Sequence, residues 1–328
     1  MNQRDDEAMG LALAEGERAR LHSPPNPWVG AVIVDRDGVV VGQGHTQPPG
    51  AAHAEIEALR HAGERARGAT IYVTLEPCAH VGRTGACTDA LIAAGVKRVV
   101  VGIEDPDPLV SGRGLEALRA ADVEVEVGVL ADEAASQLAA YVHHLRTGRP
   151  YVVVKVASTL DGVVSMADGS SQWITGVDAR QDSHVLRAQS QAIVVGAGTV
   201  RSDDPRLTAR LGDVIVEPLR VVLGEAPASA KVHPCLEYRG NLGALLDELA
   251  TRGVVQVLVE GGPRVVSSFV EAGLVQRFVW YYAPAYAGSV GTAGALSAFG
   301  TPTISALRRG RVVGVRQVGE DVRLDVEV

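Results

Sequence analysis

The chain has 328 residues, which suggests two domains of ordinary size. Hydrophobic residues make up 46% and charged residues 21%, as in globular domains with real cores. The net charge of −8, with no run of Lys or Arg, disfavours a nucleic-acid partner. Residues 1–13 lack the apolar core of a signal peptide, and no stretch approaches the roughly 18 apolar residues of a membrane span. We therefore expect a cytoplasmic protein with no membrane partner.

In the first half of the chain, helix and strand patterns alternate. Ala8, Leu11 and Ala12 fall on one side of a first predicted helix. Two apolar runs, 29–34 and 39–41, flank Asp-Arg-Asp-Gly and predict a β-hairpin. The remaining pattern predicts helices over 53–62, 88–94, 114–121 and 130–145 and strands over 69–75, 98–103 and 123–127. This alternation indicates an α/β sheet covered by helices.

A polar break at 146–150, which contains Gly and Pro, predicts a domain boundary. We place a first domain at 1–146 and a second at 147–328. The second half also has an α/β pattern, with strands expected over 151–156, 192–195, 219–223, 254–259 and 278–283 and helices over 179–188 and 263–272.

The three cysteines are too few for a disulfide scaffold. Cys78 and Cys87 lie close together and follow His53 and Glu55, whereas Cys235 stands alone and is expected to be a small buried hydrophobe. One imidazole and two thiolates leave a tetrahedral zinc ion with an open position for water, as in catalytic zinc sites. Glu55 then has the chemistry to carry a proton from that water to a ring nitrogen, as in nucleobase deaminases.

Two other interpretations of these residues stay open. His80 could complete a closed, structural Cys₂His₂ site, although Cys78 and His80 are only two residues apart. Alternatively, His53 is an isolated histidine at a helix terminus. Neither interpretation explains why His53 and Glu55 occur together with both cysteines.

The segment 77–87, Pro-Cys-Ala-His-Val-Gly-Arg-Thr-Gly-Ala-Cys, resembles the signature of the bifunctional deaminase/reductase family of riboflavin biosynthesis, called RibD or RibG. Residues 26–30, Asn-Pro-Trp-Val-Gly, resemble the family segment that lines the pyrimidine pocket. The chain departs from the family at Gly85 and Ala86, where two prolines are usual. Because proline fixes φ, we expect a more mobile loop here.

The resemblance continues through the second half. It rests on Lys-Val-Ala-Ser-Thr-Leu-Asp-Gly at 155–162, Gly-Ser-Ser-Gln-Trp-Ile-Thr at 169–175, Leu-Arg-Ala at 186–188, Val-Gly-Ala-Gly-Thr-Val at 195–200, Asp-Asp-Pro-Arg-Leu-Thr at 203–208 and Glu-Gly-Gly-Pro at 260–263. It implies a cytidine-deaminase-like three-layer domain followed by a dihydrofolate-reductase-like domain that uses NADPH. The implied activities are a zinc-dependent diaminohydroxyphosphoribosylaminopyrimidine deaminase and a 5-amino-6-(5-phosphoribosylamino)uracil reductase.

The resemblance also implies the residues of the second site. The cofactor would contact Ala157, Trp173, Thr199, Asp203, Gly262, Pro263, Arg264, Val265, Val266, Ser267 and Ser268. The substrate would contact Ser171, Arg187, Leu207, Arg210 and Glu260. Glycines after a strand and a proline in the first turn of a helix suit a phosphate site. Guanidinium groups at 187 and 210 suit phosphate clamps, and Glu260 suits sugar hydroxyls. Lys155 and Asp203 are the candidate proton donors.

A second departure concerns residues 224–246. Gly224 and Glu225 replace the family's usual Asp-Ser, and the segment 226–246 looks short, as if a strand had been trimmed. Glu225 would be unfavourable near a phosphate, so we leave it out of the site. This departure leaves open a rival function, a binding protein with a degenerate reductase half. A second rival is a tRNA- or DNA-editing deaminase. We expect a homo-oligomer that acts on a small phosphoribosylaminopyrimidine.

Overall fold

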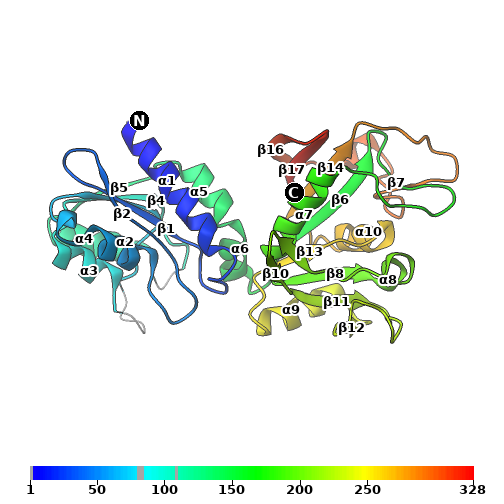
Figure 1. The fold of residues 1–328 in the computed structure, drawn as a ribbon, viewed down its shortest axis with the longest axis horizontal. Helices are drawn as coiled ribbons and strands as arrows, with labels where there is room; N and C mark the ends of the chain where they lie inside the picture. The colour runs from blue at the N-terminus through cyan, green and yellow to red at the C-terminus, as the bar shows by residue number, and fades with distance from the viewer. Residues whose placement is uncertain (1–2, 80–84, 108–109) are drawn as a thin grey trace. The chain divides into compact units, whose positions relative to one another are not determined.

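The computed structural model describes residues 3–79, 85–107 and 110–328. The chain divides into two compact units, residues 1–148 and residues 149–328. The division falls two residues after the boundary expected from the polar break. Each unit has its own sheet (Figure 1).

Unit 1 is built on a five-stranded sheet with the order β2-β1-β3-β4-β5. The strands β2, β1 and β3 pair antiparallel, and β3, β4 and β5 pair parallel. Its strands are β1 (Gly30–Val34), β2 (Val40–His45), β3 (Thr70–Leu75), β4 (Arg98–Ile103) and β5 (Glu124–Val127). Its helices are α1 (Gln3–Ala19), α2 (Ala54–Ala62), η1 (Gly63–Ala66), α3 (Cys87–Ala94), α4 (Arg113–Ala120), α5 (Ala131–Gln137) and α6 (Ala139–Thr147).

The helices of unit 1 form two layers, one on each face of the sheet. Helices α1 and α5 lie against each other on one face, and α2, α3 and α4 cover the other (Figure 1). The central strands β1, β3 and β4 are therefore buried on both faces, which explains their nearly continuous runs of apolar residues. The predicted three-layer α/β arrangement is confirmed.

Two predictions for unit 1 are wrong in detail. Leu11 does not face the core with Ala8 and Ala12, because it is 42% exposed and Met9 fills the buried position instead. The single helix expected over 130–145 is two helices, which are separated at Leu138 (φ −90°, ψ 7°). Leu138 is fully buried, so the break fixes an apolar side chain in the core.

Unit 2 has an eight-stranded sheet with the order β12-β11-β8-β13-β6-β14-β17-β16. The strands from β12 to β14 run parallel, and β17 and β16 add an antiparallel hairpin at one edge. Four short strands lie outside this sheet, where β9 pairs with β10 and β7 pairs with β15. The strands of unit 2 are β6 (Tyr151–Thr159), β7 (Val163–Ser165), β8 (Ala192–Gly196), β9 (Ala209–Leu211), β10 (Val214–Val216), β11 (Leu219–Leu223), β12 (Leu236–Tyr238), β13 (Gln256–Val259), β14 (Arg277–Ala283), β15 (Ala293–Gly294), β16 (Arg311–Val318) and β17 (Asp321–Glu327). Its helices are α7 (Val177–Ala188), α8 (Ala197–Asp203), α9 (Leu242–Thr251), α10 (Pro263–Glu271) and η2 (Ile304–Ala306).

Helices cover both faces of this sheet. Leucines of α9 and Phe269 of α10 pack with the central valines and with Trp280 on one face. Successive side chains of a strand point to opposite faces, so Tyr281 faces the other side. There its hydroxyl donates to Asp182 of α7 at 2.6 Å. The strands expected in this half are all present, whereas α9 and the β16–β17 hairpin were not predicted.

The segment expected to have lost a strand retains a short one. β12 spans only three residues, pairs with β11 and forms one edge of the sheet. Glu225 is exposed, pairs with Arg239, and does not line the cavity described below, consistent with leaving it out of the site. Cys235 precedes β12 and is only partly buried, so the expectation of a buried hydrophobe is wrong.

Candidate active sites

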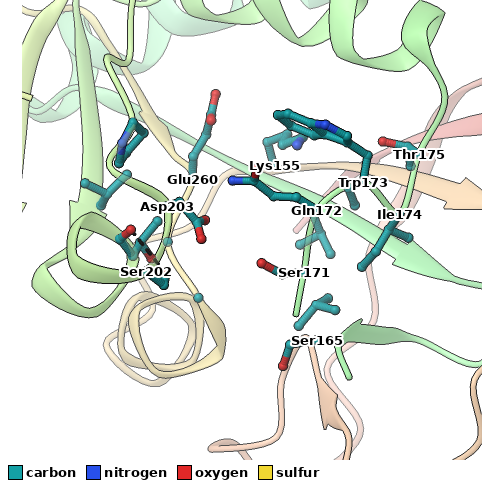
Figure 2. A pocket seen from close by; sticks show the side chains of 18 of the residues that line it. Lys155, Ser165, Ser171, Gln172, Trp173, Ile174, Thr175, Ser202, Asp203 and Glu260 are labelled. Atoms are coloured by element: carbon teal, nitrogen blue, oxygen red, sulfur yellow. Dashed lines mark hydrogen bonds between the residues drawn. The ribbon is translucent and has the colours of Figure 1, made fainter. Parts of the chain in front are cut away.

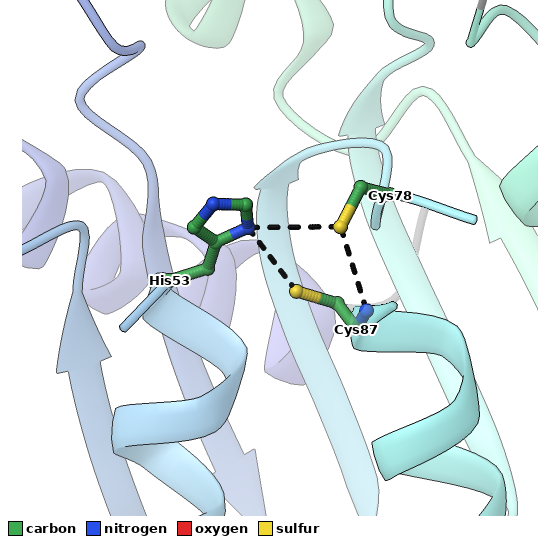
Figure 3. Close-up of side chains that lie close together, drawn as sticks. All are labelled: His53, Cys78 and Cys87. Atoms are coloured by element: carbon green, nitrogen blue, oxygen red, sulfur yellow. Dashed lines mark hydrogen bonds between the residues drawn. The ribbon is translucent and has the colours of Figure 1, made fainter. Parts of the chain in front are cut away.

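Three predicted metal ligands converge in unit 1. His53 lies immediately before α2, Cys78 follows β3, and Cys87 is the first residue of α3 (Figure 3). The Nδ1 atom of His53 is 3.6 Å from Sγ of Cys78 and 3.3 Å from Sγ of Cys87. Residues that are distant in sequence thus present one nitrogen and two sulfurs to a common point.

This donor set fits a tetrahedral zinc ion. Zn–S bonds of about 2.3 Å and Zn–N bonds of about 2.0 Å at tetrahedral angles place sulfur and nitrogen about 3.5 Å apart. The two observed distances, 3.6 and 3.3 Å, lie close to that value. The competing Cys₂His₂ interpretation depends on His80, which lies outside the described residues.

The surroundings favour thiolate at Cys78. The thiol of Cys87 donates to its sulfur and, with His53, lowers the pKa of Cys78. The backbone N–H of Cys87, at the start of α3, also donates to this sulfur at 3.4 Å. A helix N-terminus stabilises negative charge, so the fold itself prepares Cys78 to bind a cation.

Glu55 lies in the first turn of α2, two residues after His53, and is buried. Burial raises the pKa of Glu55 to about 6, and the neighbouring Cys78 thiolate contributes to the shift. A carboxyl group with a pKa near neutrality can both accept and release a proton at physiological pH. This position and this pKa are what a proton carrier needs.

A buried carboxylate supports the segment that holds Cys78. Glu76, two residues before Cys78, accepts backbone hydrogen bonds on both oxygens from the segment that leads into α4. The donors are the amides of Asp105, Gly112, Gly114 and Leu115, at 3.2, 3.0, 2.8 and 3.4 Å. Sequence reasoning missed this role, because nothing in the pattern around Glu76 indicates which distant amides it meets.

Two further segments of unit 1 resemble the family's sequence, one around Trp28 and one that contains Gly85. Trp28 is fully buried, and its indole N–H donates to the carbonyl of Gln137 at 2.7 Å. Gly85 has a φ of +77°, which proline cannot adopt. Most of the loop that we expected to be mobile consists of residues 80–84, which lie outside the described residues.

Unit 2 contains a cavity of about 610 Å³ (Figure 2). Its wall comes from β6, the segment 169–175, α7, α8, the segment 205–210 and the start of α10. It includes twelve of the sixteen residues predicted for cofactor and substrate: Ala157, Trp173, Thr199, Asp203, Gly262, Pro263, Val266, Ser171, Arg187, Leu207, Arg210 and Glu260. The predicted residues that do not line it are Arg264, Val265, Ser267 and Ser268 of α10.

A buried ion pair lies in the wall of this cavity. Arg187 Nε and Nη2 donate to the two carboxylate oxygens of Glu260 at 2.8 and 2.6 Å. Both side chains are largely buried, with 20% and 9% exposed. Arg187 is thus already paired, which the sequence-based assignment as a phosphate clamp did not anticipate.

Lys155 completes the charged group (Figure 2). It lines the cavity and is partly buried. Burial lowers the pKa of Lys155; the negative charge of Glu260 opposes this shift, and the positive charge of Arg187 adds to it. Its Nζ lies 5.8 Å from the ring centroid of Tyr281. A lysine with a lowered pKa gives up a proton more readily than an exposed one.

Arg210 differs from Arg187. It extends from β9 into the cavity wall, and its guanidinium lies 3.2 Å from Nε2 of His184. The backbone N–H of Arg210 donates to Nδ1 of the same ring at 3.3 Å. A neutral imidazole accepts at only one nitrogen, so His184 cannot satisfy both donors. The guanidinium of Arg210 therefore retains capacity to bind an anion.

The cavity meets the N-terminus of α10. Gly262 is its N-cap, Pro263 follows in the first turn, and both line the cavity. A Cβ atom at Gly198 would meet nothing within 4 Å, so open space adjoins the backbone there. Gly196 and Gly261 instead allow close packing against Val265, since a Cβ on either would approach that side chain within 3 Å. The residues at 197–199 begin α8 rather than forming a loop.

Trp173 lines the cavity and is 70% exposed, and the guanidinium of Arg180 lies 4.8 Å from its ring centroid. An ordinary core tryptophan would be buried, so the structure leaves this ring available to a ligand. Sequence reasoning gave no role to several lining residues that lie within or near the quoted motifs, among them Gln172, Thr175, Arg180, Ser202 and Arg206. Their nearness in sequence to the motifs was the available signal.

Helices that could cross a membrane are absent from the described part of the chain, because none is both long and apolar enough.

Comparison with known proteins matches both units. The family profile described as the cytidine and deoxycytidylate deaminase zinc-binding region matches residues 2–103, and the one described as the RibD C-terminal domain matches residues 150–324. The riboflavin biosynthesis protein RibD of Mycobacterium tuberculosis (strain H37Rv) is 42% identical, with 98% of this chain and 96% of that protein covered. RibD of Escherichia coli (strain K12) is 38% identical, with 98% of each covered.

Solved structures give the same result. Form 1 of Acinetobacter baumannii RibD matches with a TM-score of 0.88, 38% identity and 99% coverage of both chains. The diaminohydroxyphosphoribosylaminopyrimidine deaminase/5-amino-6-(5-phosphoribosylamino)uracil reductase of Thermotoga maritima matches with a TM-score of 0.87, 32% identity and 99% coverage of both chains. With its deaminase-type first unit and reductase-type second unit, the chain belongs to the RibD family of riboflavin biosynthesis proteins.

Proposed function

We propose that unit 1 removes an amino group by hydrolysis, as ammonia, from a diaminopyrimidinone that carries a ribosylamino phosphate. Zinc would be held by His53, Cys78 and Cys87. The observation that supports this proposal is the convergence of one nitrogen and two sulfurs beside the buried carboxylate of Glu55. A bound zinc ion would supply a nucleophile from water at neutral pH. Glu55 would take the proton that water loses and deliver it to the ring nitrogen and to the departing ammonia.

We propose that unit 2 uses NADPH to reduce the ribose of the deaminated product, in its open form, to a ribityl chain. A cavity of about 610 Å³ can hold a nicotinamide beside a sugar phosphate. The N-terminus of α10 and the open space at Gly198 suit a cofactor phosphate. Arg210 and Lys155 both line the cavity. Arg210 would bind the substrate phosphate, and Lys155 would hold a proton near the sugar.

The experiment that tests both proposals is an assay of the two half-reactions on the full-length chain. Glu55→Gln should abolish ammonia release from the diaminopyrimidine, because an amide cannot carry the proton. The same variant should still oxidise NADPH when supplied with the deaminated product. Glu57→Gln, on the same helix, is the matched control and should retain both activities. Near-normal ammonia release by Glu55→Gln would refute the role of Glu55.

The rival functions predict different results. An editing deaminase would bind a labelled oligonucleotide at physiological salt, which the net charge of −8 disfavours. A binding protein with a degenerate reductase half would fail to oxidise NADPH with either substrate. The expected homo-oligomer stays a prediction, which sedimentation of the purified chain would test.

A further inference from the structure

A second group of metal-binding side chains lies in unit 2, at the start of the edge strand β12. We propose that His233, Cys235 and Glu237 bind a divalent transition cation of the zinc type. One donor atom from each residue lies within 4.8 Å of the other two. None of the three residues lines the cavity. The site is therefore separate from the proposed reductase chemistry and does not depend on it.

The spacing of the donors suits tetrahedral coordination. Sγ of Cys235 is 3.4 Å from Nδ1 of His233. This separation is close to the value of about 3.5 Å expected when sulfur and nitrogen bind the same zinc ion. It also falls between the two sulfur–nitrogen distances, 3.3 and 3.6 Å, of the site at His53.

Groups outside the three residues orient two of them. The Nε2 atom of His233 lies 3.0 Å from the carbonyl oxygen of Pro227. A carbonyl only accepts hydrogen bonds, so Nε2 carries the proton and the lone pair of Nδ1 points toward Cys235. One oxygen of Glu237 accepts the N–H of Ala226 at 2.9 Å. Metal-binding histidines and carboxylates are held by such outer hydrogen bonds.

The donor chemistry selects the type of cation. An imidazole nitrogen and a thiolate favour zinc and related transition metals over Mg²⁺ and Ca²⁺, which prefer oxygen ligands. The thiolate and the carboxylate would together balance the two charges of the ion. The nearby guanidinium of Arg220 pairs with Glu217 at 3.1 Å, which offsets its repulsion of a cation. A fourth position would be open to water, since His233 and Glu237 are exposed.

A bound ion would join the short strand β12 to the turn that precedes it. β12 has only three residues and a single neighbouring strand, β11. Because Pro227 and Ala226 hold two of the ligands, the ion would link residues 226–237 into one unit. The expected role is stabilisation of this sheet edge.

The test measures zinc stoichiometry on the full-length chain. The protein is stripped of metal and titrated with zinc against a chromophoric chelator. Wild type should bind two zinc ions per chain, and Cys235→Ser or His233→Ala should bind one. Cys78→Ser should lose the other ion. His61→Ala, which removes an exposed histidine elsewhere, is the control and should bind two. Saturation of wild type at one ion would overturn the proposal, as would two ions in Cys235→Ser.

Cobalt provides a second measurement that does not depend on those variants folding identically. In the double variant Cys78→Ser, Cys87→Ser, a thiolate-to-cobalt absorption can come only from Cys235. We expect this band in the double variant, and its absence would contradict the site. Glu237→Gln is a milder change that should weaken cobalt binding about tenfold while NADPH oxidation is unchanged. Unchanged cobalt affinity would exclude Glu237 as a ligand.

Discussion

The backbone of Gly114 packs directly on the segment that presents Cys78. Its N–H donates to Oε1 of Glu76 at 2.8 Å, and a Cβ atom at this position would lie 2.0 Å from the carbonyl oxygen of Pro77. The start of α4 therefore fixes the backbone next to Cys78, a proposed zinc ligand.

Gly114→Ala should consequently damage the proposed zinc site without changing any of its three proposed ligands. The added methyl group must displace Pro77, which moves Cys78 out of position. We expect loss of bound zinc and of ammonia release, with NADPH oxidation retained by unit 2. Gly10→Ala is the matched control, because a Cβ there meets nothing within 4 Å. Full zinc content in Gly114→Ala, measured by the chelator assay, would show that the segment can relax.

Arg187→Ala should destabilise unit 2 as well as impair its chemistry. Removing one partner of a buried ion pair leaves the other charge uncompensated, which costs about 3 kcal/mol or more. Here that partner is Glu260, with 9% of its side chain exposed. Calorimetry of the full chain should show a lowered unfolding transition for unit 2. A double variant, Arg187→Met with Glu260→Gln, should recover part of the loss, and no recovery would argue against coupling of the pair.

Acid should weaken unit 2 through Glu260. Burial opposes ionisation of this carboxyl, but Arg187 outweighs it, and the pKa of Glu260 is lower than usual. A carboxyl whose pKa is lower in the folded state stabilises the fold above its unfolded pKa, about 4.3, and loses that contribution as the pH falls through the folded pKa. The melting temperature should therefore fall more steeply below about pH 5 in wild type than in Glu260→Gln. Parallel curves would contradict this attribution.

Arg210→Ala should weaken substrate binding selectively. A hydrogen bond to a charged group contributes about 1.5–3 kcal/mol, so KM for the phosphorylated substrate should rise roughly 10- to 100-fold. KM for NADPH should stay near the wild-type value. A dephosphorylated substrate is the control, since the variant and wild type should use it equally poorly. An equal rise in both KM values would show that Arg210 does not recognise the substrate phosphate.

Local pattern predicted most of the secondary structure, and the failures have physical causes. β16 is exposed along most of its length, so no buried face imposes a regular alternation on residues 311–318. Local pattern also cannot distinguish the exposed Leu11 from the buried Met9. Both are apolar, and only the packing of α1 on the sheet decides that Met9 is inside.

Motifs identified the residues of each site but not their partners. The spacing of His53, Cys78 and Cys87 indicated a common ion, and the three side chains do meet. For Arg187 the motif indicated a phosphate contact, yet its first partner is Glu260, 73 residues away. Such a pairing depends on how β13 and α7 are brought together, which no local pattern specifies.

The position of β6 has a consequence for synthesis of the chain. This strand begins at Tyr151, directly after unit 1, yet its neighbours β13 and β14 begin at Gln256 and Arg277. Unit 1 has all its strands by Val127, so it can fold while the ribosome is still making unit 2. During that interval, the valines of β6 have no partner strand and remain open to association with other chains. A chain whose synthesis stops early would therefore combine a folded first unit with an unpaired, aggregation-prone strand.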